Sequence, residues 1–451
     1  MPKLMIIIAC FLVASCTHTG SQRQTQEIPR GVPEDVGMSS EGLNKIDELV
    51  QQYIEDGRIP GIVVGISKHN KVIYLKAHGI LEEKTQAPMP EDAIFIMASS
   101  TKPVIGVAAM ILVDDGLISL DDPVSKYIPE YANLQVAVPL KSGKASKMAS
   151  KSNNKVKAKQ KATGQSKAKA ISKAKAQGKN QKPPAYRLVP ADRPLTIHHL
   201  LTHTAGVGTR GGLGTAIGGY NAKPTDTLAS WAPRLAARPL DFQPGTRRAY
   251  SPGDGLKVVQ RVIEIASGMP VNKFIQSRIL DPLDMKDTHF AVPEDKLYRM
   301  PTRFNNKAKG DGKVFGEENG STYASGAGGL FSTTRDYLRF QQMLVNKGTL
   351  FGQQILKPET VATMTSNQVG DLATTAAKGG PGHGAGYTTG ITLDQKTARG
   401  GHIIGTYSWG GAAGTISWTT PSEELTLVYM VQRPSDLHTK IAAAVRDAII
   451  D

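Results

Sequence analysis

The two ends of the chain carry apolar patterns that predict matching elements. Residues 39–58 place apolar side chains at helical spacing between a serine and Gly57, which predicts an amphipathic helix. The run that follows, "GIVVGISKHNKVIYLKAHG", predicts a β-hairpin that turns at His69 and Asn70. Its first strand is almost entirely apolar, so we expect that strand to be buried on both faces.

The C-terminal part predicts three more strands in residues 406–432, with a last turn at the Pro-Ser pair of "TTPSEEL", and a closing helix in residues 437–450. Five strands and two terminal helices predict an α+β fold, in which the helices flank an antiparallel sheet of about five or more strands. Helical spacing in the middle of the chain predicts a second, mostly helical lobe, built from residues 103–112, 195–201, 255–266 and 334–346. We expect the active site between the sheet and this lobe.

The N-terminus, "MPKLMIIIACFLVASCTHTG", is typical of an export signal, because Lys3 precedes an apolar stretch and small residues precede Cys16. "VASC" is similar to the lipobox of bacterial lipoproteins. That similarity implies a signal peptide over residues 1–15, a lipidated Cys16 and a tether over residues 16–35, and Thr17 then suits sorting to an outer membrane. We expect an exported, membrane-anchored lipoprotein of the bacterial cell envelope, facing the periplasm or in the outer membrane. An ordinary secretory signal is the alternative.

Cysteine usage and charge narrow the function classes. Both cysteines, Cys10 and Cys16, lie in this leader, which excludes disulfides and cysteine-ligated metals from the folded part. The formal net charge is +15, but residues 141–182 contain 14 lysines and no acidic residue, and without those lysines it falls to +1. We therefore expect no specific nucleic-acid partner. The composition predicts a disordered, Lys-rich insert over residues 141–184, and its alternative role is adhesion to an anionic surface.

The stretch "IMASSTKPVIGVAAM" places two serines and a lysine immediately before an apolar helical run. Ser99 and Lys102 are three residues apart, which on a helix brings both side chains to one face. A serine hydroxyl is a poor nucleophile until a base takes its proton, and a lysine is such a base if burial and nearby positive charge keep it neutral. The alternative is structural: Ser99 or Ser100 caps the helix, and Lys102 points to water.

Two other patterns are weaker. His199 and His203 are four residues apart, as zinc ligands can be, but the glutamate of H-E-x-x-H is missing, so we predict no metal site. "AYSPG", which contains Ser251, nearly matches the G-x-S-x-G turn of α/β-hydrolases, but the alternating strands and helices of that fold are absent. Tyr250, in the same stretch, has the alternative of a core tyrosine with a hydrogen-bonded hydroxyl.

Several motifs follow one another in an order that resembles the serine β-lactamase and penicillin-binding-protein superfamily, in particular the class C relatives and the family VIII carboxylesterases: "SSTK", "LDDPVSKYIP", "TIHHLLTHTAGV", "RRAYSPGDGL", "GGLFSTTRDYLRFQQML" and "SWGGAAGT". The resemblance implies a single β-lactamase-like catalytic domain over residues 36–451 that needs no cofactor. It makes Ser99 the nucleophile and Lys102 its proton acceptor. Tyr250, which matches the family's Y-x-N tyrosine, would protonate the leaving group.

The family's third sequence motif, usually a lysine or histidine followed by Thr-Gly, falls on Trp409, Gly410 and Gly411. The resemblance implies that the next residue, Ala412, offers its backbone N–H, with that of Ser99, to the developing oxyanion. This sequence departs from the family at two positions. Trp409 replaces the usual cation of the third motif, and the residue after Ser251 is a proline where the family often has asparagine.

The Trp-Gly-Gly form of the third motif is the one that the esterase branch carries, so the resemblance implies a serine hydrolase that cleaves small carboxylic esters. The expected partner is thus a small-molecule ester or amide. One alternative is a β-lactamase or D-Ala-peptidase-like activity at the same site. The other is a catalytically inactive envelope-binding protein, which the joint presence of Ser99, Lys102 and Tyr250 disfavours.

Overall fold

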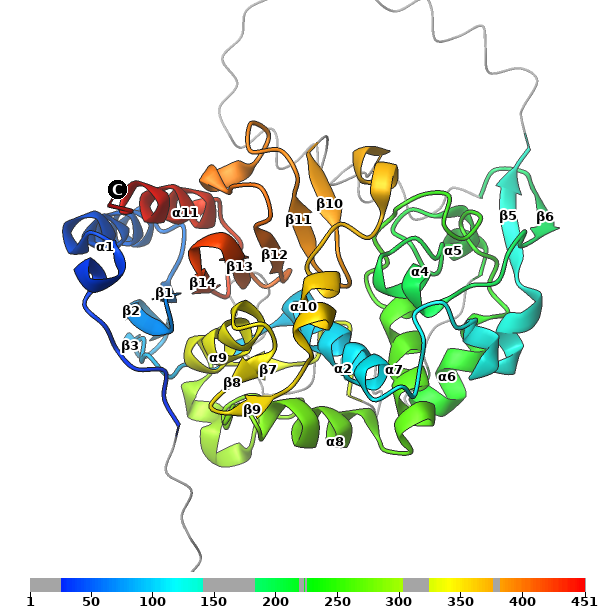
Figure 1. Cartoon of the computed structure of the whole chain (residues 1–451), viewed down its shortest axis with the longest axis horizontal. Helices are drawn as coiled ribbons and strands as arrows, with labels where there is room; N and C mark the ends of the chain where they lie inside the picture. The colour runs from blue at the N-terminus through cyan, green and yellow to red at the C-terminus, as the bar shows by residue number, and fades with distance from the viewer. Residues whose placement is uncertain are drawn as a thin grey trace, which may run out of the picture.

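The computed structural model describes residues 26–140, 183–218, 223, 225–302, 324–375 and 382–450. Its largest element is an eight-stranded antiparallel sheet that combines strands from both ends of the chain (Figure 1). In spatial order the strands are β10 (His383–Ala385), β11 (Gly390–Thr392), β12 (Tyr407–Gly410), β13 (Ile416–Thr420), β14 (Leu425–Met430), β1 (Gly61–Lys68), β2 (Lys71–Glu82) and β3 (Ala87–Pro88). The N-terminal hairpin therefore pairs directly with the last strand, and Val63 lies opposite Met430.

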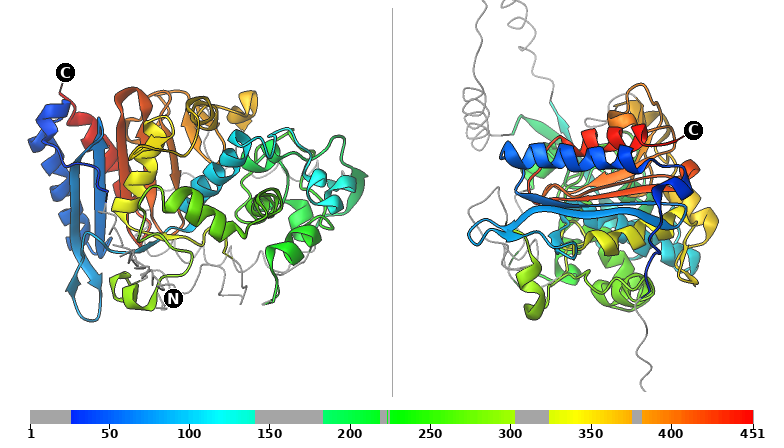
Figure 2. Two further views of the ribbon diagram at one scale, coloured as in Figure 1. Left: turned by 60° about the horizontal axis from the view of Figure 1, so that its bottom comes forward. Right: turned by 90° about the vertical axis from the view of Figure 1, so that its left-hand side faces the viewer.

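Strand β1 is buried along its whole length because helices cover both faces of the sheet. Helices α1 (Ser40–Glu55) and α11 (Leu437–Asp447) lie side by side on one face (Figure 2). Helix α9 (Thr334–Val345) packs on the other face, against β1 and β14. The predicted turn between β1 and β2 is present, and His69 and Asn70 adopt positive φ values of 49° and 60° there, as tight hairpins require.

The five predicted strands and both terminal helices are confirmed, and the five strands form the centre of the sheet. Strands β3, β10 and β11 lie toward its edges and were not predicted, because two or three residues are too few to show an alternating pattern. The assignment of residues 334–346 to the helical lobe is wrong. Helix α9 lies against the sheet, where Gly65 of β1 leaves room for Leu338: a Cβ on Gly65 would come within 2.6 Å of that side chain.

The helical lobe is built around α2 (Lys102–Asp114), whose residues from Lys102 to Leu112 are all buried. A helix that is apolar on all sides lies inside a protein, and α2 contacts α7 (Asp254–Ser267), α8 (Val271–Ile275) and α10 (Pro358–Met364). The other helices are α4 (Ile197–Leu201), α5 (Leu213–Ile217) and α6 (Leu228–Leu235). In the described part of the chain, three short strand pairs lie outside the main sheet: β4 (Phe95–Ile96) with β7 (Phe331–Ser332), β5 (Gln135–Pro139) with β6 (Tyr186–Pro190), and β8 (Thr349–Leu350) with β9 (Gln353–Gln354).

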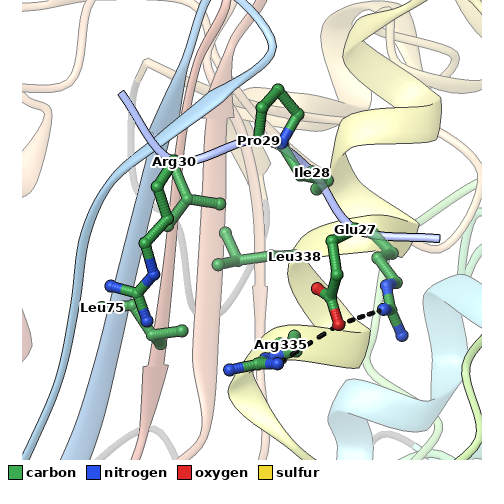
Figure 3. A pocket seen from close by; sticks show the side chains of 9 residues that line it. Glu27, Ile28, Pro29, Arg30, Leu75, Arg335 and Leu338 are labelled. Atoms are coloured by element: carbon green, nitrogen blue, oxygen red, sulfur yellow. Dashed lines mark hydrogen bonds and ion pairs between the residues drawn. The ribbon is translucent and has the colours of Figure 1, made fainter. Parts of the chain in front are cut away.

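The first described residues run along β2 and contact α9. Val72 donates a backbone hydrogen bond to the carbonyl of Pro29 at 2.8 Å. Glu27 pairs with Arg335 at 3.2 Å and with Arg339 at 3.1 Å (Figure 3). A cavity of about 190 Å³ lies between this segment, β2 and α9, and none of the predicted catalytic residues lines it.

Two predicted segments lie outside the described residues: the leader with Cys16, and residues 141–182 of the Lys-rich insert. The lipid anchor, the export signal and the insert's contacts therefore stay predictions. The described chain ends before the insert at Leu140 and resumes at Pro183, and β5 and β6 pair with each other on either side of it. Among the described helices, none is long and apolar enough to cross a membrane.

Candidate active site

Ser99 lies in a single 3₁₀ turn, Ala98–Thr101, that leads directly into α2. Its neighbours Ser100 and Thr101 are buried and bonded elsewhere. The Ser100 hydroxyl lies 3.0 Å from that of Thr415, and the Thr101 hydroxyl accepts the N–H of Leu330 at 3.1 Å. Ser99 is partly exposed, so it is the hydroxyl of the three that faces the site. The capping alternative is wrong, because neither this turn nor α2 begins with a side-chain cap from a serine.

The Lys102 amine lies 3.1 Å from Ser99 Oγ and also contacts two backbone carbonyls. Its Nζ donates to Pro252 O at 2.8 Å and to Ala327 O at 2.5 Å. Burial lowers the pKa of Lys102 to about 7, because the charged form loses its hydration. A neutral amine has two hydrogens and one lone pair. The two carbonyls take both hydrogens, and the lone pair then faces the Ser99 hydroxyl.

Tyr250 approaches Ser99 from the segment that precedes α7. Its hydroxyl donates to Ser99 Oγ at 2.8 Å, and Lys102 Nζ lies 5.4 Å from the centre of its ring. Burial raises the pKa of Tyr250, while the hydrogen bond to Ser99 and the charge of Arg210 act in the opposite direction. The phenol therefore holds its proton near neutral pH and is a donor toward Ser99.

Ser251, the alternative nucleophile, has a structural role in this fold. Its side chain is buried, and its Oγ accepts the N–H of Gly255 in the first turn of α7 at 3.0 Å. This contact satisfies one of the free N–H groups at the start of the helix. The structure thus brings Ser99, Lys102 and Tyr250 together and keeps Ser251 apart from them.

His203 lies in the site, whereas its spacing from His199 in the sequence indicated only a potential zinc ligand. It does not share a helix with His199, because α4 ends at Leu201 and His203 follows with a φ of 60°. The His203 ring is buried, stacks on Trp409 at a centroid distance of 5.8 Å, and lies 4.9 Å from the Tyr250 ring. Burial, with the nearby positive charges, lowers the pKa of His203 to about 3. A neutral imidazole therefore packs against the two other rings, which also contact each other at a centroid distance of 6.0 Å.

His199 takes part in a helix cap. Its Nδ1 accepts the backbone N–H of Thr196 at 3.1 Å, and Thr196 caps α4 in return. The premise of a histidine pair on one helix is therefore wrong. In the part of the chain that the structure describes, no three potential metal ligands come together.

The third motif lies beside the turn that carries Ser99. Trp409 and Gly410 end strand β12. Gly411 donates its N–H to Thr415 O at 2.7 Å, and a Cβ at that position would lie 2.1 Å from Met97 O, so only glycine fits. Ala412 follows in an exposed turn. The oxyanion role of the Ala412 N–H remains a prediction.

One of the two carbonyls that contact Lys102 belongs to a loop that the sequence did not indicate. Gln260 of α7 is fully buried, and its amide donates to Ala324 O at 2.7 Å and accepts the Gly326 N–H at 2.9 Å. These two bonds hold the loop whose Ala327 carbonyl reaches Lys102. A glutamine on the apolar face of a predicted helix was the available signal, since buried amides need partners.

Comparison with known proteins identifies the family of the chain. Residues 46–450 match the family model named Beta-lactamase. Protein Rv1367c of Mycobacterium tuberculosis is 31% identical over 414 residues, which cover 88% of this chain and 91% of that protein. Esterase EstB of Burkholderia gladioli is 29% identical, with coverage of 83% and 86%. The solved structure of EstCE1, a hydrolase with promiscuous acyltransferase activity, has a TM-score of 0.67 at 23% identity and covers 91% of this chain and 99% of its own. The chain therefore belongs to the β-lactamase family, and it is a serine hydrolase.

Proposed function

We propose that the protein hydrolyses small carboxylic esters through an acyl-enzyme on Ser99. The observation that carries the proposal is the position of Ser99 Oγ, 3.1 Å from Lys102 Nζ and 2.8 Å from the Tyr250 hydroxyl. A nucleophile between a base and an acid is the arrangement that acyl transfer requires.

In the proposed reaction, Lys102 accepts the proton of Ser99 while Oγ attacks the ester carbonyl. The N–H groups of Ser99 and Ala412 would stabilise the oxyanion, and losing one such donor typically costs about 2.7–4 kcal/mol. Tyr250 donates its proton to the departing alkoxide, and the Lys102 proton restores the phenol. Water then attacks the acyl-enzyme and releases the acid.

The third motif supports esters over β-lactams as substrates. A β-lactam carries a carboxylate beside its reactive carbonyl, and Trp409 offers no charge to meet it. A charge-assisted hydrogen bond is worth about 1.5–3 kcal/mol, or some tens of fold in binding. An uncharged ester has no such contact to lose. The similarity to EstB, which is an esterase, also supports this choice.

A direct comparison of substrates on one preparation tests the proposal. We expect a kcat/KM for p-nitrophenyl acetate far above those for nitrocefin and benzylpenicillin, and covalent labelling of Ser99 by a fluorescent phosphonate. A ratio that favours the β-lactams would contradict the ester assignment and leave the Ser99 mechanism standing. Absence of labelling by both phosphonate and penicillin probes would favour an inactive binding protein.

A further inference from the structure

Arg248 is a half-buried cation for which no described residue provides an anion or a hydrogen-bond acceptor. Other shielded arginines of the described chain are paired: Arg299 with Asp287 at 2.8 Å, and Arg339 with Asp336 at 3.1 Å. Burial lowers the pKa of Arg248, and no neighbouring carboxylate offsets that effect. Shielding an unpaired charge costs free energy, so a cation kept this way is a candidate for ligand binding.

The backbone places Arg248 next to the proposed proton donor. Ala249 donates its N–H to His203 O at 2.9 Å, and Ser251 donates to His203 Nδ1 at 3.4 Å. Two N–H groups that are two residues apart and bond the same residue are typical of an extended segment. In such a segment, side chains two residues apart share a face. Arg248 and Tyr250 are two residues apart. The positive charge of Arg248 also contributes to lowering the pKa of His203, which packs against Tyr250.

A second cation, Arg210, lies near Tyr250. Arg210 donates its backbone N–H to Tyr250 O at 3.2 Å, and its side chain is exposed. Its charge is one of the influences that oppose the raised pKa of Tyr250. Arg210 thus acts on Tyr250, and Arg248 acts on His203, whose ring packs against Tyr250. No carboxylate is among the influences on the pKa of Tyr250 or Arg248. Such a surface is complementary to an anion.

We propose that Arg248, assisted by Arg210, forms an anion-binding subsite beside Tyr250, and that the enzyme prefers esters whose leaving group is a hydroxy acid. This inference rests on the proposed function. Tyr250 protonates the leaving oxygen there, so the part of the substrate nearest to Arg248 is the alcohol portion. A guanidinium binds a carboxylate with two parallel hydrogen bonds, which gives both affinity and orientation.

The proposed turnover consumes one ester and one water. The bond between Ser99 Oγ and the acyl carbon forms as the ester C–O bond breaks, and the hydroxy-acid alkoxide takes the proton of Tyr250. The hydroxy acid leaves with its carboxylate still ionised, and water then hydrolyses the acyl-enzyme.

Two acetyl esters that differ in one charge test the subsite. They are 4-acetoxybenzoate, whose leaving group carries a carboxylate, and 4-acetoxybenzamide, which is neutral; each kcat/KM is divided by the uncatalysed rate. We expect the parent enzyme to favour the benzoate by about tenfold, as one charge-assisted contact allows. Arg248→Gln should lower the benzoate rate about tenfold more than the benzamide rate and so remove this preference, while Arg248→Lys should keep part of it.

Arg247→Gln is the matched control, because Arg247 is the adjacent exposed cation and its guanidinium lies 4.6 Å above the ring of Phe242. It should keep the full preference. Added salt should weaken the part of the preference that Arg210 provides, since the charge of this exposed side chain is screened. Equal rates for both esters in the parent, or equal losses for both in Arg248→Gln, would overturn the subsite. Turnover of neither ester would contradict the proposed function itself, and this inference with it.

Discussion

Lys102 Nζ donates a hydrogen bond to the backbone carbonyl of Pro252 at 2.8 Å. Pro252 stands where the resemblance implies an asparagine, and the sequence alone indicates only a missing side-chain amide. A carbonyl oxygen belongs to every residue type, so proline keeps the contact that orients the lysine. The departure therefore removes a group that could contact the substrate and leaves the base of the site in place.

The three residues around Ser99 Oγ should differ in their effect on ester hydrolysis. Ser99→Ala should abolish turnover of p-nitrophenyl acetate, and Lys102→Ala should lower it by at least about 10³-fold. When catalytic residues act together, removal of any one of them costs most of the rate enhancement. Tyr250→Phe should leave a small residual rate. Ser251→Ala is the control: it removes a helix contact and should affect mainly the melting temperature. Loss of activity in Ser251→Ala with retention in Ser99→Ala would contradict the assignment.

The pH profile should report the ionisation of Lys102. The base must be neutral, and the pKa of Lys102 is about 7, so kcat/KM should fall about tenfold per pH unit below that value and level off above it. Tyr250 has a raised pKa and stays protonated on the plateau, and His203, with a pKa of about 3, does not titrate in this range.

A neutral ester should be used for this profile, followed at a wavelength where nitrophenol and nitrophenolate absorb equally. An acidic limb with its midpoint near pH 7 supports the neutral-lysine mechanism. A profile that rises only near the ordinary pKa of lysine would show that Lys102 is charged at neutral pH, which contradicts a mechanism with a neutral lysine at that pH.

His203 should act as a positioning residue for Tyr250. His203→Asn keeps a residue type that tolerates the positive φ but removes the ring that packs against Tyr250 and Trp409. We expect kcat to fall by about ten- to a hundredfold, because small displacements of a catalytic group are costly. Rates should be normalised to sites titrated with a phosphonate, so that a loss of folded protein does not count.

His198→Asn is the matched control for this variant, since it removes a half-buried histidine that contacts Tyr387. It should lower stability without a comparable loss of kcat. Equal kcat losses in both variants would indicate a purely structural role for His203.

The Lys-rich insert should be dispensable for folding. Leu140 donates its N–H to Ala185 O at 2.8 Å, so the chain positions on either side of the insert are already neighbours. Replacing residues 141–182 by a short Gly-Ser linker should leave the melting temperature and the turnover of p-nitrophenyl acetate close to those of the parent. A large loss of either would show that the insert contributes to the fold.

The amino-acid sequence by itself determined the elements whose pattern is local and long. The helix before Gly57, the hairpin at His69 and Asn70, and the closing helix all follow from the spacing of apolar residues over ten or more positions. The pairing of Ser99 with Lys102 is local as well, because three residues on a helical turn bring two side chains together whatever the rest of the chain does.

Only the tertiary structure decided what depends on distant parts of the chain. It placed α9 on the sheet, since an amphipathic pattern tells which face of a helix is buried and not which partner covers it. It bonds Ser100 to Thr415, brings the Tyr250 hydroxyl to Ser99 and engages Ser251 at a helix start. The carbonyls that orient Lys102 come from positions 150 and 225 residues further along the chain. Backbone groups have no sequence signature, so folding alone brings them to the amine.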